Sequence, residues 1–304
     1  MAKPAKNLKP VLFRHRLEYA ALLAVAPLIR ALPRQAALRF GRRLGSLSRW
    51  FLAARRKLAE DNVHQAFPDW SPQQITALVK RNFEQLGMSA VDSLRLDLFA
   101  VDTPEEYFEI RGVEHLREAQ DLGRGVILLT GHLGFWEAGN YVFPALGVPL
   151  DTIAKPLKNR LTDAYFQRIR THFGADIISS RKGARQILKS LQSGRAIGLL
   201  LDQHISPPGS VPVDFFGRKA YVTTAITNMA MKYRIPIVPT FCLRRPDNRY
   251  DVWIDPPLLL EGDGEAALAE NTQYLTNIIE QAIRRDPGQW FWLHKRWRKI
   301  NITK

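Results

Sequence analysis

The stretch Gly125-Val126-Ile127-Leu128-Leu129-Thr130-Gly131-His132 places a short apolar run directly before a glycine and a histidine. Such runs are typical of strands that are buried on both faces, as in parallel sheets. Further short apolar runs lie at residues 152–154, 176–179, 196–202, 235–242 and 251–254, and helical patterns lie between them at 135–146, 162–173, 182–193, 223–233 and 265–285. Strands that alternate with helices predict an α/β domain whose mostly parallel central sheet is covered by helices on both faces.

Upstream of this alternation the sequence favours helices. Residues 71–96 begin with Ser71, a good N-cap, followed by Pro72 at the first helical position. Residues 112–121 form a second helical pattern. We expect two regions: a basic amphipathic helical segment at residues 1–60 and the α/β domain at residues 61–304.

The net charge of +15 is concentrated at the two ends of the chain. Residues 1–60 carry 14 Lys and Arg against 2 Asp and Glu, residues 284–304 carry 7 against 1, and the remainder has a net charge of −3. A nucleic-acid enzyme more often spreads basic residues over its working cleft. Basic ends on a near-neutral body instead favour an anionic membrane surface as partner, and not a nucleic acid.

The N-terminal segment has the pattern of a helix that lies on a membrane surface. Its apolar stretch, Tyr19–Ile29, is shorter than the roughly 20 residues that span a bilayer, and it contains Pro27. Apolar and aromatic residues interleaved with arginines follow up to residue 56. We therefore predict a monotopic anchor; a tilted transmembrane span and an ordinary amphipathic core helix remain alternatives. A cleaved signal peptide is not favoured, because no small-x-small site follows the apolar stretch cleanly.

The single cysteine, Cys242, excludes a disulfide framework and a cysteine-rich zinc site. It suits a reducing compartment without proving one. Cys242 lies within an apolar run, and no G-x-S-x-G motif occurs, so no side chain stands out as a covalent nucleophile.

Polar side chains follow two of the predicted strands, at the edge of the sheet where reactive groups gather in α/β folds. His132 and Glu137 follow the first, and Asp202 and Gln203 follow residues 196–201. A helix N-terminus after His132 would keep the imidazole neutral and able to accept a proton from a hydroxyl. Glu137 would hold the other ring nitrogen, which requires a turn between the two. The alternative is that His132 only caps a helix.

The segment GHLGFWEAG, residues 131–139, resembles the GHFGNWE-type box of the lipid A biosynthesis acyltransferases, within the glycerolipid acyltransferase group that is defined by an H-x4-D/E motif. The resemblance covers nearly the whole chain from about residue 17. The other matching positions follow in the order of that family: Asn62, Ala66-Phe67-Pro68, Lys155-Pro156-Leu157-Lys158-Asn159, Arg170, Gly174, Leu201-Asp202-Gln203, Phe215-Phe216-Gly217, Thr223, Pro239, Arg244, Glu280, Ile283-Arg284, Pro287, Gln289-Trp290 and His294-Lys295-Arg296-Trp297.

The resemblance implies transfer of a fatty acyl chain from the thioester of acyl carrier protein, or of coenzyme A, to a hydroxyl of a lipid A precursor or similar glycolipid. It also implies the cytoplasmic face of the inner membrane, and neither metal nor bound cofactor. His132 and Glu137 match the catalytic pair. Arg170 is expected to anchor a substrate phosphate or to support that pair, and Asp202 to orient Arg170 or to position the substrate. The other expected substrate-binding or supporting residues are Asn159, Lys155, Gln203, Phe216, Gly217 and Thr223, with Phe216 and Gly217 lining an acyl tunnel.

Two departures leave the acceptor open. Phe135 replaces the usual Asn of the box, and Lys155 stands where an Arg often precedes Pro-Leu-Lys-Asn. A phosphatidylinositol mannoside or a lysophospholipid is therefore an alternative acceptor. The non-enzyme alternative is a basic peripheral membrane-binding protein. Three further features also have simpler interpretations. His204 would face solvent, Thr223 would be an N-cap, and the aromatic and basic segment 289–299 would belong to an interface or to the core.

Overall fold

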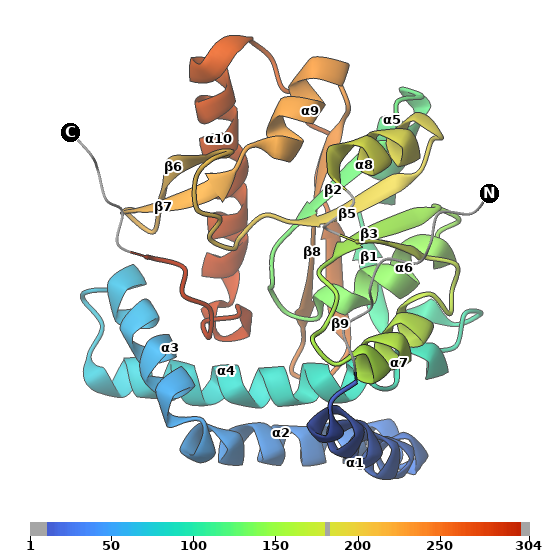
Figure 1. Cartoon of the computed structure of the whole chain (residues 1–304), viewed down its shortest axis with the longest axis vertical. Helices are drawn as coiled ribbons and strands as arrows, with labels where there is room; N and C mark the ends of the chain where they lie inside the picture. The colour runs from blue at the N-terminus through green and yellow to red at the C-terminus, as the bar shows by residue number, and fades with distance from the viewer. Residues whose placement is uncertain (1–10, 180–182, 299–304) are drawn as a thin grey trace.

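A computed structural model describes residues 11–179 and 183–298. A seven-stranded sheet, in the order β1-β9-β8-β2-β5-β3-β4, forms its centre (Figure 1). Strands β2, β3, β4, β5 and β8 are parallel, β9 is antiparallel to β8, and β1 is parallel to β9. The strand bounds are β1 Phe108–Arg111, β2 Val126–Thr130, β3 Leu150–Ala154, β4 Asp176–Ser179, β5 Ala196–Leu200, β8 Ile237–Arg244 and β9 Tyr250–Ile254.

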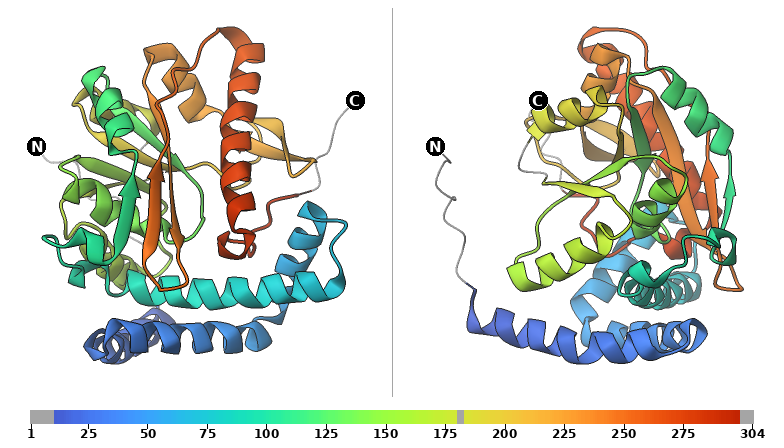
Figure 2. Two further views of the ribbon diagram at one scale, coloured as in Figure 1. Left: turned by 180° about the vertical axis from the view of Figure 1, so that it is seen from behind. Right: turned by 90° about the vertical axis from the view of Figure 1, so that its right-hand side faces the viewer.

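Alternate residues of the central strands are buried against different helices. Ile127 and Leu129 of β2 belong to a core shared with α8 (Gly183–Gln192), α9 (Ala225–Tyr233) and α10 (Gly264–Arg285). Val126 and Leu128, on the other face, pack with α5 (Val113–Asp121) and α6 (Gly139–Ala145). Because both faces are covered, the strands are continuously apolar, as expected for a parallel sheet (Figure 2). The predicted fold class is confirmed.

Within the described residues, the α-helices before the sheet are α1 (Phe13–Ala31), α2 (Arg34–Phe51), α3 (Ala53–Ala66) and α4 (Pro72–Ser93). Helix α4 begins as predicted: the Ser71 hydroxyl accepts a hydrogen bond from the Gln74 backbone N–H, and the Gln74 side chain accepts one from the Ser71 N–H. Helix α4 lies between α2 and the body of the molecule (Figure 1).

Glycines let α2 and α4 approach closely. A Cβ on Gly45 would lie 2.1 Å from the Phe83 carbonyl oxygen, and one on Gly87 would lie 2.2 Å from the Gly41 carbonyl oxygen. The buried carboxylate of Asp92 on α4 then accepts hydrogen bonds from Arg34, at the start of α2. These contacts attach the N-terminal helices firmly to the domain.

The expected strands and helices are found within a few residues of their predicted bounds, with the start of the predicted helix at residue 182 outside the described residues. The sequence did not reveal β1 or the hairpin of β6 (Ser210–Phe215) and β7 (Arg218–Thr223). Strand β1 is short, and β6 contains Pro212 and Asp214. The expected division at residue 60 lies inside α3, which runs on to Ala66; the division itself stays a prediction.

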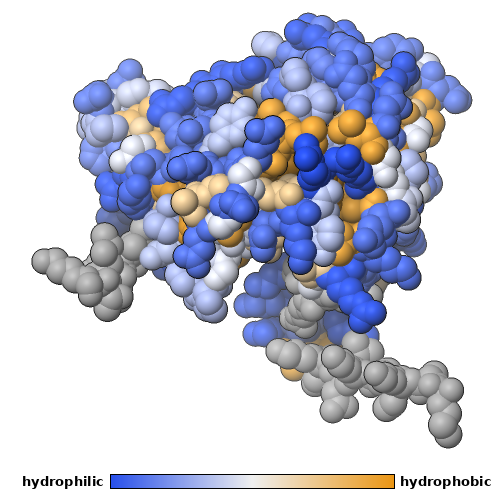
Figure 3. Space-filling model, turned by 90° about the horizontal axis from the view of Figure 1, so that it is seen from above, coloured by the Kyte–Doolittle hydropathy of each residue, from blue (hydrophilic) through white to orange (hydrophobic). Residues whose placement is uncertain are grey.

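Exposed apolar side chains gather on the N-terminal helices. Of the 21 large apolar residues that are exposed in the described chain, 13 lie between Leu12 and Leu52. None of the helices within the described residues is long and apolar enough to cross a membrane. The opposite side of the molecule, seen from above in Figure 3, is hydrophilic over most of its edge, with hydrophobic residues toward its middle.

Candidate active site

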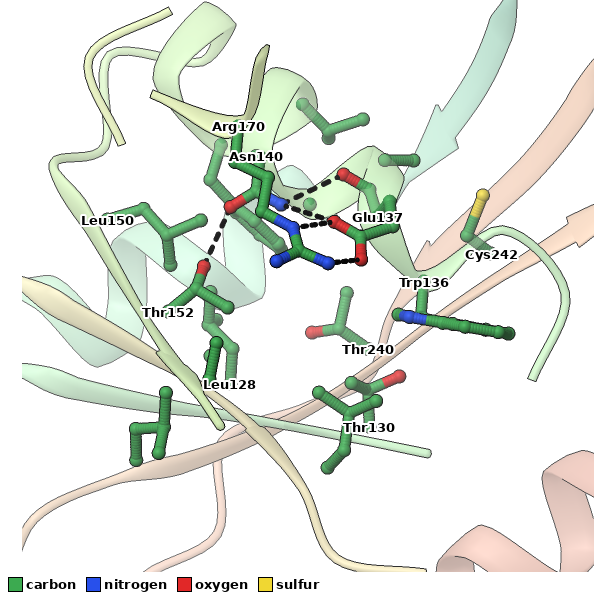
Figure 4. A pocket seen from close by; sticks show the side chains of 18 of the residues that line it. Leu128, Thr130, Trp136, Glu137, Asn140, Leu150, Thr152, Arg170, Thr240 and Cys242 are labelled. Carbon is green, nitrogen blue, oxygen red and sulfur yellow. Dashed lines mark hydrogen bonds and ion pairs between the residues drawn. The ribbon is translucent and has the colours of Figure 1, made fainter. Parts of the chain in front are cut away.

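A cavity of about 270 Å³ lies between α6 and one face of the sheet. Strands β2 and β5 contribute alternate residues to it, as expected from the pleat: Leu128 and Thr130 from β2, and Gly198 and Leu200 from β5. The remaining wall is largely apolar and comes from α6, β3, β8 and β9 (Figure 4). His132, Glu137, Lys155 and Arg170 also line the cavity. A mainly apolar cavity with a few polar groups is typical of a ligand site.

His132 and Asp202 meet at the edge of the sheet, as expected for residues that follow the neighbouring parallel strands β2 and β5. His132 Nδ1 lies 2.7 Å from Asp202 Oδ1, and the His132 backbone N–H donates to Asp202 Oδ2 at 2.7 Å. The Asp202 side chain is only 2% exposed, whereas that of His132 is 24% exposed. Asp202 therefore holds the inner nitrogen of an imidazole that stays partly exposed.

The expected pairing of His132 with Glu137 was wrong. The carboxylate on the histidine is that of Asp202, so the expectation that Asp202 orients Arg170 was wrong as well. Glu137 lies on a single 3₁₀ turn, Trp136–Ala138, and its carboxylate is held by Arg170 and Asn140. The turn between His132 and Glu137 does not bring the acid back to the ring.

Glu137 belongs to a second polar cluster in the cavity wall (Figure 4). Arg170, the last residue of α7 (Arg160–Arg170), donates to both of its carboxylate oxygens, from Nε at 2.7 Å and from an Nη at 2.5 Å. Asn140 Nδ2 donates to Glu137 at 3.2 Å, and the Asn140 side-chain oxygen accepts from the Thr152 hydroxyl at 2.8 Å. A bidentate pair of this kind fixes both partners in place.

The contact between His132 and Asp202 shifts the pKa values of both groups. Burial lowers the pKa of His132, but the carboxylates of Asp202 and, less strongly, Glu137 outweigh it and raise the pKa above the usual 6.5. Burial raises the pKa of Asp202, but His132 and the Trp290 indole N–H outweigh it and lower the pKa to about 2. The expectation that a helix N-terminus keeps His132 neutral was wrong, because α6 begins only at Gly139 and the two acids act in the opposite sense.

The backbone N–H groups of the three residues after His132 are all bonded within the protein. That of Leu133 donates to the Gly131 carbonyl, that of Gly134 to Gln289, and that of Phe135 to Cys242. Gly134 has a positive φ of 61°, and a Cβ there would lie 1.8 Å from the Cys242 carbonyl oxygen, so only glycine fits. With the His132 N–H bound to Asp202 as well, residues 132–135 offer no free backbone donor to a substrate oxyanion.

Three neutral side chains surround the exposed part of the imidazole. Gln203 Nε2 lies 3.2 Å from His132 Nε2, so Gln203 is at the site as predicted. Trp136 and Phe291 pack against the ring with centroid distances of 5.3 and 6.1 Å. Because Gln203 occupies the position that a substrate hydroxyl needs, its amide has to move when such a hydroxyl binds.

Two further predicted residues lie near the site in different ways. Lys155 is exposed and lines both the main cavity and a smaller polar cavity that shares Arg170. Asn159 is buried: its side-chain oxygen caps α7, and its amide donates to the His15 carbonyl and the Glu18 carboxylate of α1. Asn159 thus supports the helix that carries Arg170.

Phe216 and Gly217, which were expected to line an acyl tunnel, do not line this cavity. Both have a positive φ, of 54° and 70°, and form the tight turn between β6 and β7. Phe216 packs against Trp290, Trp292 and Trp297 in the core, away from the cavity. Thr223 ends β7, and its hydroxyl accepts from the Ala225 backbone N–H at 3.4 Å, but the N-cap of α9 is Thr224 and not Thr223.

His204 and much of the aromatic segment 289–299 are buried in the protein. His204 is 9% exposed and packs against Tyr221, so it does not face solvent. Trp290 and Trp292 are core residues, while Lys299 lies outside the described residues. The sequence did not reveal the role of Asn140 or the contact of Trp290 with Asp202. The only sequence signal for Asn140 is its position three residues after Glu137. No group of three or more potential metal-binding side chains occurs among residues 11–179 and 183–298.

One known protein family matches this chain over most of its length. The family model described as "Bacterial lipid A biosynthesis acyltransferase" matches residues 9–299. The chain belongs to this family. It is an acyltransferase of the lipid A biosynthesis type, which accords with a carboxylate-bound imidazole that lines a mainly apolar cavity.

Named relatives of this acyltransferase share most of its length. The lipid A biosynthesis lauroyltransferase of Escherichia coli (strain K12) is 28% identical over 285 residues, covering 91% of this chain and 90% of the relative. The lipid A biosynthesis palmitoleoyltransferase of the same strain is 28% identical over 263 residues, covering 85% and 83%. A phosphatidylinositol mannoside acyltransferase of Mycolicibacterium smegmatis (strain ATCC 700084 / mc(2)155) is 26% identical over 197 residues, covering 63% of each chain.

Proposed function

We propose that this acyltransferase moves a fatty acyl chain from the thioester of acyl carrier protein to a hydroxyl of a lipid A precursor. The observation that carries the proposal is that His132, hydrogen-bonded to Asp202, lines a mainly apolar cavity. The two Escherichia coli relatives, which are named for lipid A biosynthesis, favour a glycolipid acceptor. The net charge of +15 favours an acidic carrier protein as donor, with coenzyme A as the alternative.

In the proposed mechanism His132 Nε2 removes the proton of the acceptor hydroxyl while Nδ1–H stays bonded to Asp202. The alkoxide oxygen attacks the thioester carbonyl and forms a tetrahedral intermediate. Its collapse breaks the carbon–sulfur bond, and the departing thiolate takes the proton from the imidazolium. The products are the O-acyl lipid and the free thiol, and no acyl-enzyme forms.

The oxyanion of that intermediate needs a donor other than the backbone of residues 132–135, whose N–H groups are already bonded. Arg170 and Lys155 are the cationic side chains that line the cavity. Either can stabilise the developing charge more strongly than a neutral donor does. Glu137, proposed from the family motif as catalytic, acts in this account by holding Arg170 in place.

The cavity itself is the proposed site of the acyl chain. Its volume is about 270 Å³ and its wall is mainly apolar, which suits a hydrocarbon chain. Five strands, from β9 to β3, contribute to its floor, a width of roughly 19 Å at the usual strand spacing. These dimensions suit an extended chain of medium length.

The size of the side chain at position 198 is expected to control the length of acyl chain that fits the cavity. Gly198 lies in the cavity floor opposite Leu128 and Thr152, and a Cβ there would make ordinary contacts of 3.7 Å or more. Gly198→Leu fills this part of the floor. We expect the ratio of kcat/KM for long over short acyl donors to fall by about ten-fold or more, since each methylene is worth about that much in an apolar pocket.

The measurement is a competition between acyl carrier protein thioesters of graded chain length. Gly198→Ala is the matched control, because one added carbon makes only ordinary contacts and leaves most of the space open. A folded, active Gly198→Leu protein with the wild-type chain-length ratio would place the acyl chain elsewhere.

We further propose that α1 and α2 lie on the cytoplasmic face of the inner membrane. Their exposed Phe13, Leu28, Trp50 and Phe51 are 62–86% accessible, and arginines lie between the apolar residues of α2. Replacing Trp50 and Phe51 by serine should weaken sedimentation with anionic vesicles, and Leu259→Ser, an exposed residue on the body, should not. Equal sedimentation of both variants would contradict this orientation.

The proposed function is tested with purified protein. Acyl carrier protein and coenzyme A thioesters are each offered with a lipid A precursor, a phosphatidylinositol mannoside or a lysophospholipid, and the lipids are analysed by mass spectrometry. We expect one added acyl group on the lipid A precursor with the carrier-protein donor. Acylation of the mannoside or the lysophospholipid alone would replace the acceptor, and no product from any pair would overturn the proposal.

A further inference from the structure

One indole of the C-terminal segment donates directly to the carboxylate that holds His132. Trp290 Nε1 donates to Asp202 Oδ2 at 2.7 Å, and this oxygen also accepts the His132 backbone N–H at 2.7 Å. The other oxygen, Oδ1, is left for His132 Nδ1. Two donors on one carboxylate oxygen fix the rotation of the group, so that the second oxygen points at the imidazole.

The indole is itself held in place by contacts that do not involve its N–H group. Trp290 is 2% exposed, and its ring packs edge-on against Trp292 and Phe215. The amide of Asn82 donates to the Trp290 carbonyl oxygen at 2.5 Å, and the backbone of Trp290 bridges to Leu133 in the loop after His132. These contacts therefore fix the position of the indole N–H independently of Asp202.

We propose that Trp290 is a positioning residue of the transfer reaction, which acts through Asp202 on His132. Without the indole N–H, the buried carboxylate can rotate and loses one of the donors that share its charge. When Oδ1 points away from its native direction, the imidazole spends part of the time in an unproductive orientation. This lowers kcat. A carboxylate with fewer donors also attracts the imidazolium more strongly, so the proton on His132 is held more tightly.

Trp292 provides a matched control in the same segment. It is fully buried, and its indole N–H also makes one 2.7 Å hydrogen bond, but to the Pro287 carbonyl oxygen. Trp290→Phe and Trp292→Phe each remove one indole hydrogen bond and part of one ring. Only the first removes a contact with Asp202.

The first measurement is the titration of His132 by NMR with labelled histidine, the His132 signal being assigned by its loss in His132→Ala. The charged and titratable groups that influence the pair are Glu137, His294 and Arg296, and all remain in both variants. We expect the His132 midpoint to rise in Trp290→Phe and to stay at the wild-type value in Trp292→Phe. An unchanged or lowered midpoint in Trp290→Phe overturns the proposal.

The second measurement is acyl transfer, and this arm alone depends on the proposed function. We expect kcat to fall by about 10- to 100-fold in Trp290→Phe with little change in KM, because a buried hydrogen bond to a charged group is lost. Trp292→Phe should stay within about three-fold of wild type. Equal losses in the two variants would mean a packing role only and would overturn the proposal. If wild type transfers no acyl group, the proposed function fails while the titration still decides on Trp290.

A third variant covers the case in which Trp290→Phe does not fold. Benzothienylalanine at position 290 keeps the two fused rings and replaces the N–H by sulfur. It is expected to give the same rise of the His132 midpoint and the same loss of kcat as Trp290→Phe. Wild-type behaviour in this variant contradicts the proposal, because only the N–H group is missing.

Discussion

His132→Ala is expected to lower kcat by about 10⁴-fold, at the upper end of what a general base contributes. The variant removes both the group that takes the proton from the acceptor and the group that returns it to the thiolate. KM for the acyl donor should change little, because the cavity wall is formed mostly by residues of the sheet and of α6. The measurement is the rate of lipid product under saturating substrates.

Two variants accompany this experiment. His132→Asn keeps a donor for the buried Asp202 carboxylate and guards against loss of activity through unfolding. His115→Ala is the control: it removes a histidine of α5 whose Nδ1 contacts the Ile254 carbonyl oxygen, outside the cavity. Near wild-type transfer by a folded His132→Ala protein would remove His132 from the mechanism.

Asp202→Asn is expected to lower kcat by about 10³- to 10⁴-fold although it replaces only one oxygen by an NH₂ group. Oδ2 of Asp202 receives two N–H donors, from the His132 backbone and from Trp290. An asparagine therefore places its carbonyl oxygen at that position and turns its NH₂ group toward His132 Nδ1. The imidazole then has to accept at Nδ1 and carries its proton on Nε2, where it cannot take a proton from the acceptor.

Glu137→Gln separates this effect from a general change of charge. The amide side chain of this variant keeps an acceptor for Arg170, and Glu137 itself makes no hydrogen bond to His132 among those found in the described residues. The loss of activity in Glu137→Gln is expected to be smaller than that in Asp202→Asn. A larger loss in Glu137→Gln would restore Glu137 as the direct partner of His132.

Much of the fold could be predicted because its signal is local. The run Val126–Leu129 is apolar throughout since both of its faces are buried, and Ser71 and Gln74 cap their helix through residues three apart. The β6–β7 hairpin escaped prediction because β6 carries Pro212 and Asp214 and alternates between buried and exposed positions. Its tight turn places Phe216 in a core that is completed only by the distant C-terminal segment.

The candidate site could be predicted in part for the same reason. His132 can be recognised because it follows an apolar strand and a glycine. Asp202 and Gln203 can be recognised because they follow the end of a second strand. The sequence could not show which acid holds the ring. Glu137 is five residues from His132, whereas Asp202 is 70 residues away and becomes its partner only because β2 and β5 are neighbours in the sheet.

The pH dependence of kcat/KM, measured for wild type and Asp202→Asn, tests most directly the claim that Asp202 steers a basic His132. The carboxylates raise the pKa of His132 above 6.5, and only the unprotonated imidazole can act as base, so the wild-type rate should rise with pH through a midpoint above 6.5. Because the pKa of Asp202 is about 2, Asp202 itself stays ionised throughout. We predict a lower midpoint in Asp202→Asn, where the charge is gone; the same midpoint in both proteins would contradict the account.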